Sequence, residues 1–542
     1  LYRTATSGEP YGQSSSSESI SWVTEQTLSY TKVFGDRHSI DAVIGYTAQK
    51  EQIDINTIIA DNFPDDLVHT VSGGQIVGGE AVQEEWSLVS GLARINYSFD
   101  DRFLVTASFR SDKSSRFGSG NKTGYFPSFS VGYRISEDIN SMDWLSDLKI
   151  RASWGRTGNF LIPNYASIGL LSTANTTFNG TLVNGQAPGA TDGISNSDLS
   201  WEKTRSYDIG LDFGFLDDRI YGSIEYFSSR TNDLLLGAAV PSALGVTNAI
   251  ANIGEVLNRG LEVTIYSNNT TGKLKWQTNV NFSTLENEVI ALGESGDPIL
   301  ISGGAGIRHI TRIGDPIGSY YGYVTDGIYQ TQSEIDASGL NDKIATPRPG
   351  DFRWKDINGD GDIDAADRTV IGNYLPDFTY GITNTFTYDN FSFSFLIQGV
   401  EGSEVLNLTR RHMGNGEANY NSYVEWVDRW RSASDPGNGE IPRANRQTGN
   451  SNNRPSNYQV EDASYIRLRN VRLSYMFPDS MLGNTFSSLQ VTLTGTNLLT
   501  ITDYLGFNPE VNNNDDNVAI QGEDYGAYPL SKVFTIGINA SF

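Results

Sequence analysis

Apolar and polar residues alternate along most of this chain. In the C-terminal segment 528–542, one set of alternate positions is apolar and the other is mostly small or polar. The apolar set consists of Phe534, Ile536, Ile538, Ala540 and Phe542. Successive side chains of a β-strand point to opposite faces, so this pattern predicts a strand with one apolar face.

The same alternation recurs from one end of the chain to the other. It predicts strands near 19–32, 38–50, 86–98, 102–113, 124–138, 145–156, 201–214, 219–232, 256–268, 274–288, 317–328, 375–387, 391–401, 462–477, 487–500 and 530–542. Repetition of one apolar and one polar face over so many strands is typical of a transmembrane β-barrel, whose outer face contacts lipid. The predicted fold class is therefore all-β, an antiparallel barrel in outer-membrane lipid.

The connections between these segments are of two lengths, as in barrels with short periplasmic turns and long external loops. The long ones lie near 51–85, 157–200, 233–255, 289–305, 329–373, 403–460 and 502–528. Short and long connections alternate throughout only if an additional strand lies at 307–313, which brings the count to about 17. An odd number cannot close an even-stranded barrel, and five further strands upstream would give the 22 of plugged outer-membrane transporters. We therefore expect residues 1–542 to be the C-terminal part of such a barrel.

Composition agrees with this architecture and excludes several functions. The 542 residues include 56 Gly, 27 Tyr and 25 Phe, which suit tight turns and aromatic girdles. The absence of cysteine excludes disulfides and thiolate metal sites. A formal net charge of −25 argues against nucleic-acid binding, which requires basic patches.

The strongest local motif is the acidic stretch DINGDGDIDAAD at 356–367. Its oxygen-bearing residues have the spacing of a calcium-binding loop, with Gly361 at the position of the sharp turn. The candidate ligands are Asp356, Asn358, Asp360, Asp362, Asp364 and Asp367. Asp367 replaces the longer glutamate that usually ligates at the last position, which weakens bidentate ligation. A hairpin tip that binds no ion is the alternative, and the two interpretations stay open.

A second candidate is aromatic. Trp426 and Trp430 lie in the segment 417–432, which we expect to contain a short helix in the longest external loop. Their rings are candidates for stacking on a sugar substrate, and packing of the loop on itself is the alternative. We find no arrangement of nucleophile, base and acid that indicates an enzyme.

Several motifs resemble the SusC/RagA family of TonB-dependent outer-membrane transporters. The most specific are DASYIRLRNVRLSYMFP at 462–478, GTNLLTITDYLGFNPE at 495–510 and the terminal YPLSKVFTIGINASF. Others are LKIRASWGRTGN at 148–159, NIGEVLNRGLEVTI at 252–265 and GDPIGSYYGYVTDGIYQ at 314–330.

This resemblance implies an energised importer in the outer membrane of a Gram-negative bacterium. It implies a large nutrient substrate, an oligosaccharide or a peptide, and a SusD-like lipoprotein as partner. It also implies an N-terminal plug and a segment that contacts the TonB complex, and we find neither in this sequence. The competing hypothesis is a passive or adhesive surface barrel that binds a partner through its external loops without energy coupling.

Overall fold

The computed structural model contains one large antiparallel sheet and several small ones. It describes residues 11–64, 67–68, 70–139, 142–168, 171–178, 181–188, 196–239, 248–293, 295–303, 306–414, 421–445, 452–483, 486–512, 517 and 519–542. The large sheet has 16 strands, and its order follows the chain from β1 to β29 wherever a strand belongs to it. The predicted all-β fold is confirmed.

The strands of the large sheet are β1 (Gly12–Phe34), β2 (His38–Asp61), β3 (Gln75–Phe99), β4 (Phe103–Ser114), β5 (Thr123–Arg134), β6 (Leu145–Asn159), β9 (Glu202–Phe215), β10 (Ile220–Ala239), β11 (Asn248–Thr271), β12 (Leu274–Ser283), β13 (Glu286–Leu292), β22 (Phe378–Tyr388), β23 (Phe391–Glu401), β26 (Tyr465–Met476), β27 (Ser488–Thr502) and β29 (Val533–Ser541). β13 pairs with β11 outside the main order, which leaves 15 strands side by side.

Two predicted barrel strands are wrong. The segments 307–313 and 317–328 form β15 (Gly306–Thr311), β16 (Ser319–Gly322) and β17 (Thr325–Ile328), and none of these belongs to the large sheet. They are buried on both sides: β15 ends in the four consecutive buried residues Arg308, His309, Ile310 and Thr311. A run buried on both sides belongs to a protein core, whereas a lipid-facing strand alternates.

Two of the expected long loops are much shorter than predicted. β2 and β3 extend through most of 51–85 and leave only 62–74 between them, and β10 and β11 extend through most of 233–255. β10 ends in the apolar run Leu234, Leu235 and Leu236, and β2 has Ile58 and Ile59 next to each other near its end. These ends therefore lack the alternation on which the prediction depended. Residues 240–247 lie outside the described residues.

The chain divides into two compact units, and each has its own buried clusters. The first comprises Leu1–Tyr133, Ala152–Tyr207 and Thr231–Gly254. It carries the hairpin of β7 (Leu171–Phe178) and β8 (Thr181–Pro188) and the 3-10 helix η1 (Val71–Gly73). An aromatic cluster lies next to its strand ends, formed by Phe117, Phe126, Ile162, Leu199 and Trp201.

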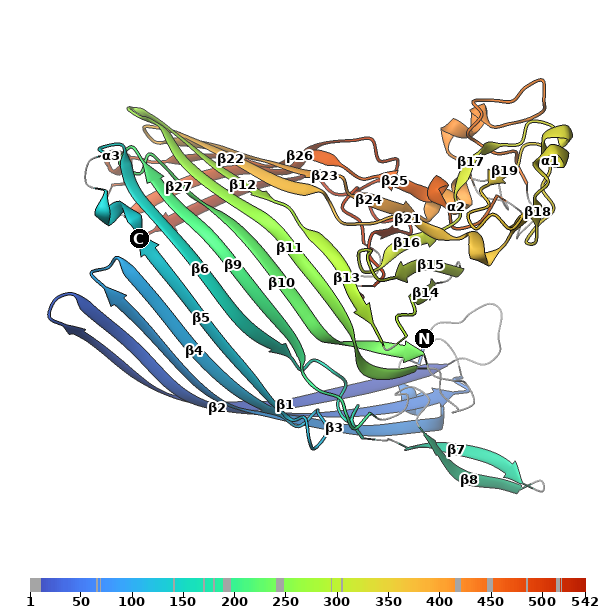
Figure 1. Ribbon diagram of the computed structural model, residues 1–542, viewed down its shortest axis with the longest axis horizontal. Helices are drawn as coiled ribbons and strands as arrows, with labels where there is room; N and C mark the ends of the chain where they lie inside the picture. The colour runs from blue at the N-terminus through green and yellow to red at the C-terminus, as the bar shows by residue number, and fades with distance from the viewer. Residues whose placement is uncertain are drawn as a thin grey trace. The chain divides into compact units, whose positions relative to one another are not determined.

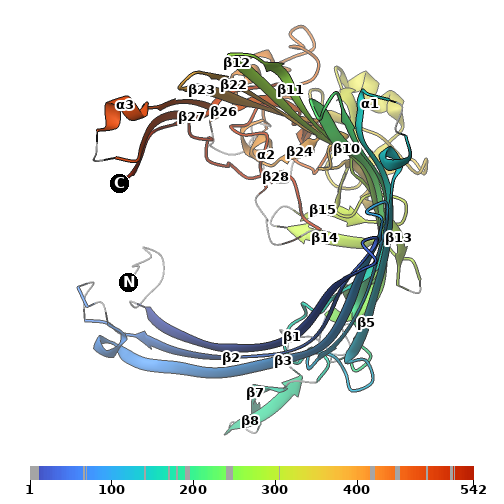
Figure 2. The same ribbon diagram turned by 90° about the vertical axis from the view of Figure 1, so that its left-hand side faces the viewer.

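The second unit comprises Arg134–Arg151, Asp208–Arg230 and Glu255–Phe542. Figures 1 and 2 show β12, β22, β23, β26 and β27 side by side in this unit, with the small sheets beyond one end of these strands. The remaining elements are η2 (Ile135–Asp138), β14 (Ile299–Gly303), α1 (Gln332–Ser338), β18 (Asn341–Asp342), β19 (Phe352–Trp354), β20 (Asp362–Ile363), η4 (Ala365–Asp367), β21 (Thr369–Gly372), β24 (Glu404–Asn407), α2 (Thr409–Met413), η5 (Val424–Asp428), η6 (Asn457–Gln459), β25 (Val460–Asp462), α3 (Asp479–Leu482) and β28 (Glu523–Asp524).

The two faces of the large sheet differ as the alternation predicts. On β29, Phe534, Ile536 and Ile538 are each more than 70% exposed, and their strand neighbours Thr535 and Gly537 lie on the other face. Exposed apolar residues in such a continuous row are stable only against lipid or another apolar surface. Among the described residues, no helix is long and apolar enough to cross a membrane.

We predict that Gly222→Ala destabilises the sheet. A β-carbon at Gly222 in β10 lies 2.0 Å from the carbonyl oxygen of Thr264, so the two strands must move apart. Overpacking of this kind costs about 1–3 kcal/mol. The measurement is the temperature at which the folded band converts to the unfolded band on detergent gels, and it should fall.

Gly91→Ala in β3 is the matched control, because a β-carbon there meets nothing within 4 Å. An equal fall for both variants would show that the loss of glycine itself, rather than the strand contact at Gly222, sets the stability.

Candidate functional site

A ladder of alternating charges lies on the polar face of β6, β9 and β10, which we call the charge ladder. The Nζ of Lys149 lies 2.7 Å from Asp212, and the Nε of Arg151 lies 3.1 Å from the same carboxylate. The Nη2 of Arg151 then reaches Glu225 at 2.6 Å. On the opposite face, Ile150 and Ile209 are exposed and apolar. The ladder therefore lies on the face directed away from lipid.

A cavity of about 450 Å³ adjoins the charge ladder. Its lining includes the carboxylates Asp147, Asp212 and Asp218. The rings of Tyr221 and Tyr266 stack beside them, with centroids 5.0 Å apart and planes at 13°. Fixed charges and tyrosine hydroxyls on a sheet face can hold polar groups, and this arrangement contains no nucleophile with an adjacent base.

The short strands of the second unit form a folded structure of their own at one end of the sheet, which we call the outer-loop assembly (Figure 1). β14, β15, β16 and β21 make a four-stranded sheet, and β25, β24 and β28 make a three-stranded one. Figure 2 shows α2, β24 and β28 close together. A buried cluster stabilises the assembly, and its members are Tyr323, Ile328, Phe352, Trp354 and Ile363.

A buried ion cluster joins distant parts of the outer-loop assembly. Arg308 donates from Nε and Nη2 to the two oxygens of Glu523 at 2.8 and 3.1 Å. His309 contacts the same carboxylate through Nε2 at 2.9 Å and the carbonyl of Gly318 through Nδ1 at 2.9 Å. Arg308, His309 and Glu523 are all buried. The cluster therefore fixes β15 to the segment around β28, more than 200 residues away in sequence.

The environment of Glu523 favours its charged form. Burial by itself would raise the pKa of this carboxyl, but the hydrogen bonds from His309 and Arg308 outweigh it and lower the pKa below the ordinary value. A folded-state pKa below the unfolded one stabilises the fold at neutral pH. That stabilisation is lost as the pH falls through the folded-state pKa.

The acidic stretch 356–367 forms a tight turn that leads into β20 and η4, and backbone amides donate to its side chains. Asp356 accepts from the amides of Gly359 and Gly361 at 2.6 and 2.9 Å. Asp367 is fully buried and accepts from the amides of Ile357 and Asp364 at 2.9 and 2.8 Å.

The other four candidate ligands also make hydrogen bonds. Asn358 and Asp360 accept from the amides two residues further on, and Asp364 accepts from Ala366. The Oδ1 of Asp362 accepts a hydrogen bond from Nδ2 of Asn341 at 2.8 Å and forms an ion pair with Nζ of Lys343 at 3.2 Å. Within the described ranges, no group of three or more acidic, histidine or cysteine side chains is placed to hold a metal ion. Calcium binding by this turn stays a prediction.

The two candidate tryptophans pack within the outer-loop assembly. Trp426 lies in η5, where a short helix was expected, and is buried with the Arg429 guanidinium 5.8 Å from its ring. Trp430 packs against the buried cluster that contains Phe352 and Trp354, and it donates from Nε1 to Gln330 at 3.1 Å. Trp430, unlike Trp426, is only half-buried. Their role in substrate binding stays a prediction.

Sequence reasoning missed the charge ladder and the ion cluster. Lys149 and Arg151 belong to a motif that was interpreted only as a strand, and Glu523 lies in a loop without periodicity. The available signal for the ladder was charge at alternate positions of a strand with an apolar opposite face. No sequence signal pairs Arg308 with Glu523, because that contact depends on how two long loops fold together.

Comparison with known proteins gives a consistent result. Residues 2–498 match the family model described as TonB dependent receptor-like, beta-barrel. TonB-dependent receptor P3 of Formosa agariphila is 34% identical over 544 residues, which cover 96% of this chain and 52% of that protein. TonB-dependent receptor SusC of Bacteroides thetaiotaomicron is 29% identical over 484 residues, covering 84% of this chain and 44% of that protein.

A solved structure is similar over nearly the whole chain. The RagAB peptide importer in its closed-closed state superposes with a TM-score of 0.82 at 25% identity, covering 98% of this chain and 56% of that one. The chain spans about half the length of the curated relatives that it matches.

We predict that Glu523→Gln loosens the segment 519–528. The substitution leaves Arg308 buried without a counter-charge, and breaking a buried pair in this way costs about 3–5 kcal/mol. Hydrogen exchange of this segment should rise at neutral pH. In the unsubstituted protein, exchange should rise only as the pH falls below about 4.3, the ordinary glutamate value, because the folded-state pKa is lower.

Glu440→Gln, at an exposed position of another loop, is the control and should change neither result. Unchanged exchange in Glu523→Gln would contradict a stabilising role for the ion cluster.

The calcium prediction has its own test. Titration of calcium into chelator-treated protein should give one binding event, and Asp360→Asn should weaken its affinity, because the amide oxygen can still ligate but the negative charge is lost. Asp389→Asn in the β22–β23 turn is the control. Absence of heat in the unsubstituted protein would show that the turn is organised by amides alone.

Proposed function

The chain belongs to the TonB-dependent receptor-like β-barrels, within the SusC/RagA family, and on this premise we propose that it is the barrel portion of an energised nutrient importer. The match of residues 2–498 to the family carries the proposal. Barrels of this family are outer-membrane proteins of Gram-negative bacteria, and the proposal places this protein there. Family members are transporters rather than enzymes, which agrees with the absence of a catalytic motif in the sequence.

The charge ladder and the outer-loop assembly support a role in passage of a large polar molecule. The ladder fixes its charges against one another, so its side chains keep their positions without a bound ligand. Such preorganisation favours the binding of polar cargo, because the side chains lose little conformational entropy when the cargo binds. The outer-loop assembly has its own buried cores, which suits a docking surface for a protein partner more than a set of mobile loops.

We infer that the substrate is an oligosaccharide or a peptide and that a SusD-like lipoprotein is the partner at the outer-loop assembly. The peptide alternative is supported by the similarity to the RagAB peptide importer. Energy would come from the TonB complex acting on a plug outside this chain. Hydroxyl-rich and amide-rich cargo both match the carboxylates and tyrosines beside the charge ladder.

The second candidate is a passive or adhesive barrel. The observation in its favour is the extent of the outer-loop assembly, which offers a large binding surface without any need for transport. A plug and a TonB-contacting segment in the full-length protein would distinguish the importer from this alternative.

We predict that the full-length protein, purified from its native membrane in detergent, carries a plug and co-purifies with a surface lipoprotein. Uptake of labelled oligosaccharides or peptides by the cells should stop when TonB is deleted. The intact mass of every chain in the complex and the uptake rate are the measurements.

Deletion of the lipoprotein gene is the control that separates binding at the cell surface from passage through the barrel. A complex without a plug, or uptake that continues without TonB, would overturn the importer and favour the passive barrel.

A further inference from the structure

His309 lies at the centre of the buried ion cluster, and both of its ring nitrogens face acceptors. Nδ1 lies 2.9 Å from the carbonyl oxygen of Gly318, and Nε2 lies 2.9 Å from a carboxylate oxygen of Glu523. His309 is only 1% exposed, so bulk water does not reach the ring. The two protein contacts must therefore satisfy both nitrogens.

These contacts determine how many protons the ring carries. A neutral imidazole has one donor nitrogen and one acceptor nitrogen, whereas the imidazolium has two donors. A backbone carbonyl cannot donate, and the Glu523 carboxylate is held in its charged form because Arg308 donates to both of its oxygens. The neutral ring would place a lone pair against one of the two acceptors. Only the imidazolium satisfies both.

The other groups around His309 keep one charge state near neutral pH. Burial raises the pKa of Tyr320, whose ring lies 5.6 Å from that of His309, so its hydroxyl stays neutral. Arg308 is always charged. β14, which pairs with β15 on its other side, carries no titratable residue. Behind Tyr320, the Glu404 carbonyl accepts from the Tyr320 hydroxyl, and the Glu404 carboxylate accepts from the amide of Asn373.

The carbonyl that Nδ1 contacts belongs to the turn 314–318, which joins the outer-loop assembly to the large sheet. The amide of Gly314 donates to the carbonyl of Val289 in β13 at 2.8 Å. The amide of Ile317 donates to Asn287, also in β13, at 2.8 Å. One end of the turn is thus bonded to the sheet, and the other end is bonded to the buried ion cluster.

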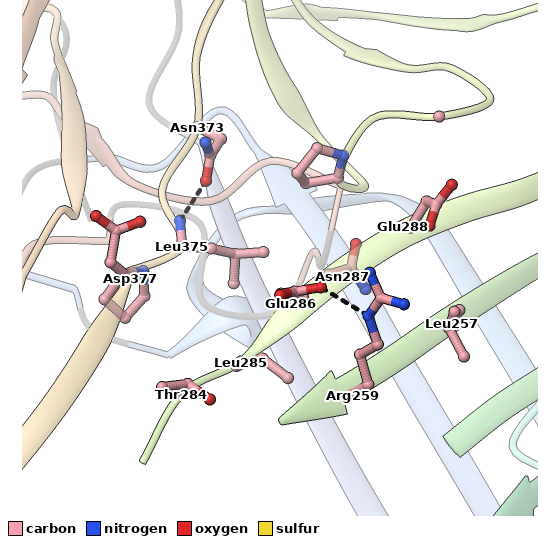
Figure 3. A pocket seen from close by; sticks show the side chains of 13 residues that line it. Leu257, Arg259, Thr284, Leu285, Glu286, Asn287, Glu288, Asn373, Leu375 and Asp377 are labelled. Atoms are coloured by element: carbon pink, nitrogen blue, oxygen red, sulfur yellow. Dashed lines mark hydrogen bonds and ion pairs between the residues drawn. The ribbon is translucent and has the colours of Figure 1, made fainter. Parts of the chain in front are cut away.

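The turn packs loosely against the sheet. A second cavity, of about 480 Å³, is lined by Gly314 and Pro316 of the turn and by Asn287 of β13 (Figure 3). The ion pair of Arg259 with Glu286, at 2.6 Å, lies on the sheet side of this cavity. A void provides no van der Waals contacts to the groups that line it. The polar contacts of the turn therefore determine whether it stays in place.

Gly318 brings a third segment to the same point. Its φ is +70°, a conformation that favours glycine, and a β-carbon there would lie 2.9 Å from the carbonyl oxygen of Ala519. Ala519 lies four residues before Glu523, in the segment that the ion cluster fixes. The turn, β15 and this segment therefore meet at one buried point.

We propose that His309 is a pH-sensitive lock between the large sheet and the outer-loop assembly. In the closed state the ring carries two protons and donates to Gly318 and Glu523. When Nδ1 loses its proton to solvent, it becomes an acceptor opposite the Gly318 carbonyl, and the turn 314–318 is released. The Nε2 proton is retained, because a hydrogen bond to a carboxylate is the stronger of the two.

The direction of the response follows from the charge of the ring. Histidine ordinarily changes charge between about pH 5 and about pH 8, so the lock is closed at mildly acidic pH and opens as the pH rises. Protonation of Glu523 acts in the opposite sense, because it weakens the cluster as the pH falls. The proposal concerns the folding of the external loops and does not depend on transport.

The test is hydrogen exchange of the segment 312–322 in the full-length protein in detergent. Exchange is measured at about pH 5.5 and about pH 8.5, which bracket the ordinary range of histidine, and is corrected for its intrinsic dependence on pH. We expect the protection of this segment to fall several-fold at the higher pH. His309→Gln should show no such fall, because its amide does not titrate.

Two control variants separate His309 from other titratable groups. His412→Gln removes a histidine from α2 of the same assembly and should keep the pH response. Glu404→Gln removes the neighbouring carboxyl, whose pKa is raised by burial, and should also keep the response. The conversion temperature on detergent gels verifies that each variant folds.

A second measurement needs no variant. Nitrogen NMR of protein labelled in histidine distinguishes protonated from unprotonated ring nitrogens, and the His309 ring is identified by its proximity to the ring of Tyr320. We expect two protonated nitrogens at the lower pH and one at the higher pH.

Three outcomes would overturn the proposal. The first is equal protection of the segment at both pH values in the unsubstituted protein. The second is a fall that persists in His309→Gln or disappears in Glu404→Gln, which would assign the response to another group. The third is an unprotonated ring nitrogen of His309 at the lower pH, which would show that the folded protein holds the neutral ring.

Discussion

Backbone hydrogen bonding in the absence of water is the constraint on which this structure depends. In lipid, each amide and carbonyl must find a partner within the protein, and strands find theirs only in a continuous sheet. The strand order of the large sheet follows the chain apart from β13, even where the connection is long, as between β12 and β22. In such a sheet, alternate side chains point to opposite faces, so one face contacts lipid and the other carries the charged residues.

Because the polar face of the large sheet does not contact lipid, it can carry charged side chains, and these form ion pairs with one another. Asp212 forms ion pairs with both Lys149 and Arg151, and Arg151 also pairs with Glu225, so three adjacent strands are joined by side chains as well as by backbone.

The outer-loop assembly is stabilised differently from the large sheet. Its connections are too long to be ordered by strand pairing alone, and small aromatic clusters and buried pairs such as Arg308 with Glu523 join segments distant in sequence. Buried pairs specify one arrangement of the loops, because an unpaired partner is costly.

The outer flank shows how a single row of side chains changes its role along a strand. On β11, the row that contains Ile265 and Val263 continues through Leu261 to Arg259, from lipid contact to an ion pair in a preformed cavity. The periodicity is unbroken, and only the depth in the membrane changes.

The sequence by itself determined the all-β class, the family resemblance and the approximate positions of the strands in the large sheet, apart from β13 and the outer ends of β2, β3, β10 and β11. The reason is that a lipid-facing strand leaves a period of two that survives any detail of packing. The segments at 307–313 and 317–328 were misassigned, since their residue pattern does not say whether lipid or a protein core covers them. The contacts of Glu523, the packing of Trp430 and the cavity at Arg259 depend on residues brought together from distant loops. Only the tertiary structure decides these, because each requires a specific approach of segments that local sequence does not encode.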